Sequence, residues 1–564
     1  MSYLTKVGSF NIDTTKLATE TQTIAGVGFE PKIVFLWWSG SLATGDAVGG
    51  GTLNFGFGAG ISSSSRFCVG GFSADAAATS DTVRFQSATS CIRAYVDGTP
   101  TVEGIADFDS MNGDGFVLMI DDQFANAYRV SYLAIGGTDL TNVYIGNKAT
   151  PAVTGNYTVT GATFQPDAVI MATQGLTAAS SVTSSPNFSL GWATGASNQG
   201  VVHIRADDNQ DISNTYGYGY NGECVSIPQV PLRNAFVQFD ADGFTLNNLE
   251  GSEARYFHYV CLKGGQYSVG ELTTRTDGAD IAETVGFQPL AVMFASVNRA
   301  LSTQDTMTVH TRMSVGAGTS ASNRAVQAVS DEDELATTET ATGNYDSAVY
   351  AHVADDAIVA LMDIKSIEST GFTCVMDDTE AVASWVTYLA MGATTLLVNV
   401  SDTVGTAETV AGYPTFVFLS VNNAVGVTDT VGLDGLATED LNASSSSTVA
   451  ALAETVVATV GTSVVNVSNA AGVTDTNAVT VGTSVVNVSN AVGAADSVTA
   501  NMTRLISVSD TIGTSEAKGA IVGTSVVAVT EAIGLAETLF GLPLIGIPIE
   551  PGSVFATGVR IHGL

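Results

Sequence analysis

The stretch Gly28-Phe29-Glu30-Pro31, followed by the apolar run KIVFLWW at 32–38, carries the strongest structural signal in the chain. Proline suits the first position of a β-strand, where a missing backbone N–H is tolerated, and the aromatic residue two positions earlier can cover one end of a core. The same order of aromatic residue, proline and apolar run returns at Phe164-Gln165-Pro166 and Phe287-Gln288-Pro289. The motif therefore predicts a strand start in each of three related copies.

Three further landmarks recur in the same order in each copy. They are a glycine-rich strand at Leu53, Phe188 and Met313, a Gly-Phe pair at Gly115, Gly243 and Gly371, and a closing apolar strand from Tyr132, Tyr259 and Tyr388. Short β-branched and aromatic runs between clusters of Gly, Asn, Asp and Ser are typical of half-buried strands. We therefore expect an all-β chain with three tandem β-sandwich domains, at 1–140, 141–265 and 266–393.

A shorter repeat follows. Runs such as VNVSNAAGVTDTN from Val465 and VNVSNAVGAADSV from Val486 recur about every 21 residues. Alternating β-branched residues and a glycine in most repeats favour strands over a coiled coil, with short helices in the Ala-rich stretches as the alternative. We predict a repetitive β stalk or interchain region at 394–540 and a β tail at 541–564. Each repeat could be one rung of an array within the chain, or could pair with the same repeat of another chain.

Composition excludes several classes of partner. The chain has 564 residues, with 20 Lys and Arg against 55 Asp and Glu, a formal net charge of −35. Such a charge repels nucleic-acid backbones and anionic membrane surfaces. The longest apolar stretch, at 539–549, is too short to span a bilayer and contains two prolines. We expect no nucleic-acid binding and no membrane insertion, and the first ten residues do not resemble a secretion signal.

The residues that usually carry chemistry are sparse and scattered. The five cysteines lack CxxC spacing and are expected to be free, buried thiols, and the histidines His203, His258, His310, His352 and His562 do not cluster in sequence. Neither a nucleophile elbow, nor a zinc-protease motif, nor a phosphate loop is present. The sequence predicts no enzyme: catalytic, cofactor-binding and metal-binding residues are each predicted as none.

Several polar and aromatic segments remain open to two readings. The run from Asp107 to Asp114 offers oxygen atoms at the spacing of a calcium loop, but an Asx turn before the Gly-Phe strand is the favoured interpretation. Asp207, Asp208 and Asp211, and the run Asp331-Glu332-Asp333-Glu334, are expected to be solvated loop charges. Trp37 and Trp38 should point to opposite faces of one strand, one into the core and one towards an interface. The stripe Tyr216, Tyr218, Tyr220 is predicted to pack in the core, with sugar stacking as the alternative.

Tandem β domains opened by these "GFxP" strands, followed by V-x-V-S-[DN] repeats and a closing FATGVRIHGL at 555–564, resemble structural proteins of tailed-bacteriophage virions of the capsid-decoration or tail-fibre type. The resemblance implies a location on the virion exterior, other virion proteins of the capsid or tail as partners, and no catalytic residues. A homo-oligomer is expected, with a trimer as one form: three copies in one chain could imitate a trimer, or three chains could wind into a fibre. The alternatives are a receptor-binding tail fibre that recognises host glycans, a cell-surface layer protein or adhesin, and a polysaccharide-degrading enzyme.

Overall fold

The computed structural model describes residues 3–230 and 232–393 in full and, between 396 and 562, the backbone of strands only. The described chain is all-β, as predicted from its composition and periodicity. None of its described segments is a helix that could cross a membrane. The chain divides into two compact units, Met1–Ala393 and Thr394–Leu564, and each is described by itself.

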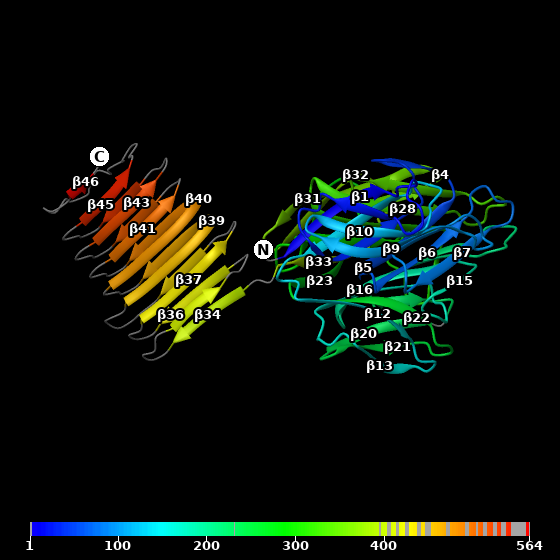
Figure 1. Cartoon of the computed structure of the whole chain (residues 1–564), viewed down its shortest axis with the longest axis horizontal. Helices are drawn as coiled ribbons and strands as arrows, with labels where there is room; N and C mark the ends of the chain where they lie inside the picture. Colours follow the sequence, from blue (N-terminus) through cyan, green and yellow to red (C-terminus); the bar gives the residue numbers. More distant parts are fainter. Residues whose placement is uncertain are drawn as a thin grey trace. The chain divides into compact units, whose positions relative to one another are not determined.

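The N-terminal unit contains three copies of one arrangement, a large antiparallel sheet facing a four-stranded sheet (Figure 1). In the first copy the large sheet has β1 (Leu4–Asn11), β11 (Arg129–Gly136), β3 (Pro31–Trp38), β5 (Leu53–Ser62), β6 (Ser65–Ser73) and β7 (Thr82–Ser87), and the small sheet has β2 (Thr21–Ala25), β10 (Gly115–Asp122), β9 (Val102–Asn112) and β8 (Ile92–Tyr95).

The second and third copies repeat this strand order. In the second, the large sheet has β12 (Asn142–Ala149), β22 (Tyr256–Lys263), β14 (Ala168–Thr173), β16 (Asn187–Gly195), β17 (Asn198–Ala206) and β18 (Thr215–Tyr220), and the small sheet has β13 (Gly155–Thr160), β21 (Gly243–Asn248), β20 (Leu232–Asp240) and β19 (Val225–Ile227). In the third, the large sheet has β23 (Gln266–Thr273), β33 (Trp385–Gly392), β25 (Ala291–Ser296), β27 (Thr311–Ser320), β28 (Asn323–Asp331) and β29 (Thr340–Tyr345), and the small sheet has β24 (Ile281–Thr284), β32 (Gly371–Asp378), β31 (Ala357–Glu368) and β30 (Tyr350–Ala354).

An apolar core lies between the two sheets of each copy. In the first copy, Val34, Leu36 and Trp38 alternate along β3 and pack with Phe108 and Phe116 of the small sheet. Equivalent phenylalanines of the other Gly-Phe pairs, Phe244 and Phe372, are fully buried in the other two cores. The Gly-Phe landmark therefore marks the strand that supplies the centre of each sandwich.

Pro31 is the first residue of β3, as its position before an apolar run predicts. Pro166 and Pro289 instead lie two residues before β14 and β25. Each proline thus stands at or just before the start of a central strand, where it removes no ladder hydrogen bond from the sheet interior.

A glycine recurs where the backbones of the two sheets approach each other closely. A Cβ atom built at Gly58, Gly191 or Gly316 would lie 2.2, 2.3 or 2.2 Å from the carbonyl oxygen of Cys91, Cys224 or Val349, respectively. These oxygens belong to the backbone just before β8, β19 and β30, respectively, and have little freedom to move. The glycine-rich strands of the sequence are therefore required by the sandwich geometry.

One strand of each large sheet comes from a different copy. β4 (Ala47–Gly50) of the first copy pairs with β29 of the third, β15 (Ser181–Thr183) of the second pairs with β7 of the first, and β26 (Thr308–Val309) of the third pairs with β18 of the second. Each copy lends a strand to one neighbour and receives one from the other, so the three copies close into a ring. The lending segments, 39–52, 174–186 and 297–310, are called the arms below.

Side chains on the outer faces of the large sheets join the copies in the same cyclic order. Gln327 Nε2 of the third copy donates to Ser131 Oγ of the first (3.0 Å). His258 of the second copy stacks on Phe67 of the first, with ring centroids 5.1 Å apart. Trp192 Nε1 of the second copy donates to Thr387 Oγ1 of the third (2.9 Å). Because Ser131, His258 and Thr387 occupy equivalent positions but make different contacts, the three interfaces are chemically distinct.

The three copies meet around a small enclosed space lined by residues of all three. The β-ladder registers place Leu53, Pro186 and Thr311 at equivalent positions there, and likewise Ser73, Ala206 and Asp331. These two triplets mark the centre of the ring.

The arms all leave from one end of the large sheets, called the arm end below. In the first copy β3 finishes there at Trp38 and β5 begins there at Leu53, so the antiparallel ladder brings the loops 12–20, 74–81 and 96–101 to the same end. β1 begins, and β33 finishes at Gly392, at the opposite end, called the hairpin end; Figure 1 places the N-terminus away from β4 and β15.

The C-terminal unit is described through its strands, which pair in parallel. They are β34 (Leu396–Asp402), β35 (Glu408–Gly412), β36 (Val417–Asn423), β37 (Thr428–Leu436), β38 (Leu441–Ser445), β39 (Ala453–Asn469), β40 (Thr474–Asn490), β41 (Asp496–Met502), β42 (Ile506–Asp510), β43 (Glu516–Val522), β44 (Val527–Glu531), β45 (Glu537–Leu542) and β46 (Arg560–His562). Ala453 pairs with Thr474 and Asn469 with Asn490, one repeat apart. The turns between these strands, all side chains of this unit and most of the β tail at 541–564 lie outside the described residues, so the stalk remains a prediction.

Candidate interaction surface

Each arm is fixed to the neighbouring copy by hydrogen bonds as well as by its strand. Ser39 Oγ at the base of the first arm donates to Gln327 Oε1 (2.7 Å). Gln86 Nε2 of the first copy donates to the Ala178 carbonyl of the second arm (2.5 Å), and Thr308 Oγ1 of the third arm donates to the Gly217 carbonyl (3.1 Å). The arms are therefore built parts of the ring, and they present fixed surfaces at the arm end.

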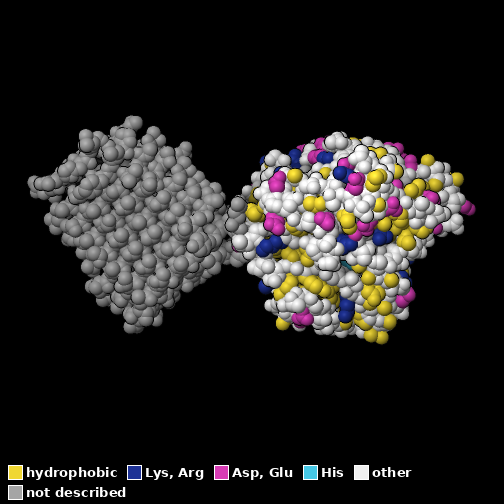
Figure 2. Space-filling view, viewed as in Figure 1, with side chains coloured by type: hydrophobic (Ala, Val, Ile, Leu, Met, Phe, Trp, Pro, Cys, Tyr) yellow, Lys and Arg dark blue, Asp and Glu magenta, His cyan; other side chains and the backbone are white. Residues whose placement is uncertain are grey.

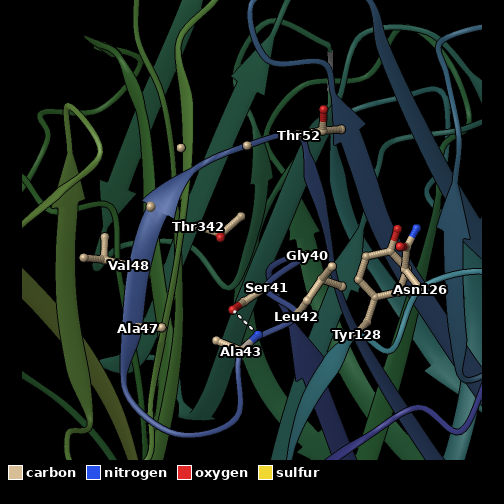
Figure 3. A pocket seen from close by; sticks show the side chains of 13 residues that line it. Gly40, Ser41, Leu42, Ala43, Ala47, Val48, Thr52, Asn126, Tyr128 and Thr342 are labelled. Atoms are coloured by element: carbon tan, nitrogen blue, oxygen red, sulfur yellow. Dashed lines mark hydrogen bonds between the residues drawn. The ribbon is translucent and has the colours of Figure 1, made fainter.

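The first arm arches over a cavity of about 410 Å³ (Figure 3). Its walls include Leu42, the glycine run 49–51, Tyr128 and, from the third copy, Thr342. Burial raises the pKa of Tyr128, the one ionisable residue of this lining. The cavity can hold an apolar or hydrogen-bonding group, but its lining offers no acid or base that titrates near neutrality.

Exposed apolar side chains are concentrated at the arm end. Every large hydrophobic residue that is exposed within 3–230 and 232–393 lies in an arm or in a loop or strand start at this end: Leu17, Leu42, Val96, Val153, Val182, Ile212, Leu301, Val309, Val359 and Val382. Each arm contributes at least one of them. Clustered exposed hydrophobic side chains are typical of interaction surfaces.

Acidic side chains surround these apolar residues. The exposed or half-buried carboxylates of the arm-end loops include Asp13, Glu20, Asp46, Asp97, Asp211, Asp277, Asp355 and Asp356. Cations are fewer, and several are paired with carboxylates of the same loop, as in Arg275 with Asp277 and Arg255 with Glu253. In the view of Figure 2, apolar and acidic side chains lie interspersed on the N-terminal unit. The surface is thus both apolar and electronegative.

The run Asp331-Glu332-Asp333 corrects one prediction. We expected solvated loop charges, but all three side chains are buried because this loop lies where the copies meet. Asp331 Oδ2 accepts a hydrogen bond from Ser73 Oγ (2.6 Å), whereas Oδ1 has no hydrogen-bond partner among the described residues. Burial raises the pKa of Asp331 to about 7, against the effect of the Ser73 hydrogen bond. Glu334, Asp207, Asp208 and Asp211 are exposed or half-buried.

His203 and His258 are buried, and burial lowers their pKa values to about 3 and about 4, respectively. His203 Nδ1 lies 2.9 Å from the Phe188 carbonyl, and His258 Nε2 lies 2.9 Å from the Ala179 carbonyl. Both rings therefore stay neutral near pH 7; His203 packs within the second copy, and His258 packs against Phe67 of the first.

The structure does bring His310 and His352 into one network, which the sequence did not predict. His310 Nδ1 lies 2.7 Å from Glu332 Oε2, Arg312 contacts both Glu332 (2.8 Å) and His352 (3.3 Å), and His352 Nδ1 lies 2.8 Å from Glu380 Oε2. Hydrogen bonds from His352 and from Thr274 lower the pKa of Glu380 although burial opposes them. The polar groups of this network therefore bind one another within the third copy. His562 lies in β46, of whose side chains nothing is described.

The Asp107–Asp114 segment spans the end of β9 and the following tight turn. Asp107 pairs with Arg66 (2.6 Å), whereas the Asp114 carboxylate accepts the backbone N–H groups of Gly26 (3.0 Å) and Gly28 (2.8 Å), which lowers its pKa. Asp114 thus holds the start of the GFxP motif. Among the described residues no three His, Cys, Asp or Glu side chains are grouped to hold a metal ion.

The remaining candidates lie within the packed interior. All five cysteines are buried and free. Trp38 lies in the core of the first sandwich and Trp37 is buried on the other face of the same strand. Tyr218 is fully buried, and its neighbours Tyr216 and Tyr220 are half-buried.

Comparison with known proteins adds no family: no protein-family model matches the chain, and no curated protein sequence is similar to it.

Proposed function

We propose that this chain is a non-enzymatic structural protein of the exterior of a tailed-phage virion, of the capsid-decoration type. The observation that supports this most is the closed ring of three copies formed by strand exchange within one chain. Such a ring presents three related sides, as a trimer does, and can occupy a threefold site with one polypeptide. Linking the copies covalently avoids the entropy cost of assembling three separate chains at each site.

The chemistry of the described residues supports the structural role. His203, His258 and His352 are buried, and each hydrogen-bonds to another part of the fold. The cavity under the first arm has no ionisable lining residue other than Tyr128. General acid–base catalysis at neutral pH needs a group that titrates near neutrality and can reach a substrate, and burial raises the pKa of Tyr128 away from that range.

Antibody labelling of purified particles in the electron microscope tests the proposal. A decoration protein predicts label distributed over the head. Label confined to the tail, with adsorption to host cells blocked by the antibody, would replace this proposal with the receptor-binding fibre. Particles without label, together with the chain in cell envelopes, would replace it with a cell-surface protein.

A further inference from the structure

The two ends of the ring differ in a way that the fold itself does not require. The hairpin end has short turns at 63–64, 196–197 and 321–322, which contain only Ser and Ala and expose no large hydrophobic side chain. The arm end has the exposed apolar residues, and each arm exposes at least one: Leu42 (52% exposed) in the first, Val182 (39%) in the second and Leu301 (40%) in the third. An aliphatic side chain held in water gains free energy when a partner covers it.

The attachment of the arms to the neighbouring copies does not depend on the exposed apolar residues Leu42, Val182 and Leu301. Strand pairing and the polar contacts of Ser39, Gln86 and Thr308 fix the arms to the neighbouring copies. The ion pair between Asp305 of the third arm and the buried Arg233 of the second copy adds another anchor. Exposed aliphatic side chains on rigid, related elements are preorganised for binding, since little conformational entropy is lost when a partner covers them.

Charge identifies the chemistry of the partner. Carboxylates such as Asp13, Asp46, Asp211 and Asp355 surround the apolar residues, so the arm end is electronegative. A second copy of this chain would bring like charges together, and a nucleic acid would be repelled. A protein surface with Lys and Arg around apolar recesses complements this face.

We propose that the arm end is a docking face for a basic protein surface that offers three related apolar recesses, one for each arm. The inference rests on the proposed function only in placing that partner on a virion. Because β33 finishes at the hairpin end, residue 393 leaves the N-terminal unit away from the docking face. The arms supply the apolar contacts, and the surrounding carboxylates orient the encounter.

Photo-crosslinking of the full chain in its native assembly tests the docking face. A benzoylphenylalanine replaces Leu42, Val182 or Leu301 in three arm-end versions, and Ser64, Ser197 or Ser322 in three matched hairpin-end versions. We expect all three arm-end positions to crosslink to one kind of partner protein, at segments where Lys or Arg flanks apolar residues, with at least tenfold less product from the hairpin-end positions. Four results would overturn the docking face: equal yields at the two ends, crosslinks confined to the hairpin end, crosslinks only between copies of this chain, or no crosslinks.

The same experiment separates the two proposals. An arm-end crosslink to a basic protein that is absent from particles would support the docking face and refute the virion location. As a second measurement, the triple variant L42S/V182S/L301S should be retained at least tenfold less in the isolated assembly, while S64A/S197A/S322A is retained as the wild type is. Equal retention of the two variants would count against the docking face, and circular dichroism shows whether both are folded.

Discussion

Ser73 Oγ donates a hydrogen bond of 2.6 Å to Oδ2 of Asp331, although the two residues lie 258 positions apart and occupy equivalent places in two different copies. In the second copy the same place is taken by Ala206. The centre of the ring is therefore asymmetric, with one hydroxyl, one methyl group and one buried carboxyl group. No second hydrogen-bond partner of this carboxyl group lies within 3–230 and 232–393, so its ionisation opposes closure of the ring.

The stability of the chain should consequently depend on pH through Asp331. Its pKa is about 7 in the fold, and its ordinary value is 3.8. From pH 4 to pH 7 the folded state keeps a proton that the unfolded state loses, so the free energy of unfolding falls as pH rises and levels off above pH 7. The loss is at most about 4 kcal/mol, since a tenfold change in proton affinity corresponds to about 1.4 kcal/mol.

Asp331→Asn should remove this contribution and raise the free energy of unfolding at pH 8 by about 1–3 kcal/mol, since a neutral side chain replaces a buried charge. Urea unfolding at pH 5 and pH 8 measures the effect, and Asp122→Asn, at an exposed position, should leave the pH dependence unchanged. A variant no more stable than the wild type at pH 8 would refute the role given to Asp331.

Thr387→Val should weaken the contact between the second and third copies. Thr387 Oγ1 accepts the indole N–H of Trp192, which is fully buried, and the valine would leave that donor without a partner. We expect a loss of about 1–3 kcal/mol in the free energy of unfolding. Thr158→Val, on an exposed strand position, should change it by less than about 0.5 kcal/mol. Similar values for the two variants would show that this interface contributes little.

Gly191→Ala should disrupt the second sandwich. The new Cβ would lie 2.3 Å from the Cys224 carbonyl oxygen and 2.6 Å from that of Gly200, and neither backbone atom can rotate away. Destabilisation by about 1–3 kcal/mol or more is expected from such overpacking. Gly49→Ala is the matched control, because a Cβ there meets no atom of the described residues within 4 Å. Thermal unfolding of both variants measures the effect as a shift in the unfolding midpoint. Equal midpoints would contradict the close approach of the sheets.

Arg233→Met should lower the free energy of unfolding more than Arg275→Met, which breaks an ion pair on the surface. Arg233 is 3% exposed and pairs with Glu223, which is fully buried, so the substitution leaves a buried charge uncompensated. The expected loss is about 3–5 kcal/mol, much of it recovered in R233M/E223Q. Arg275→Met breaks an exposed pair with Asp277 and should cost less than about 1 kcal/mol. If the double variant is as unstable as R233M, the loss does not arise from the unpaired Glu223 carboxylate.

Much of each sandwich could be predicted because its signals are local. The proline motif marks the start of a central strand and the Gly-Phe pair marks another strand, and both patterns recur in three copies. The core position of Phe116 and the close approach at Gly191 appear only in the structure. Strand alternation also predicted that Trp37 and Trp38 point to opposite faces.

The ring could not be predicted in the same way. The arm strands β4, β15 and β26 have the sequences AVGG, SVT and TV, which are too short to show a strand period, and their partners are distant in sequence. The acidic run at 331–333 looks like a surface loop for the same reason, since its burial depends on the other copies. The equivalent positions in the other copies hold Ser73 and Ala206, and their lack of charge was the available signal that this place differs from a solvated acidic loop.

Cryo-electron microscopy of intact particles, reconstructed without imposed threefold averaging at the attachment sites, tests the central claim most directly. We predict one ring of three chemically distinct sandwiches at each site. A single chain contributes the ring, and its arms contact the particle. Three separate chains around each site, or a ring attached through its hairpin turns, would contradict it.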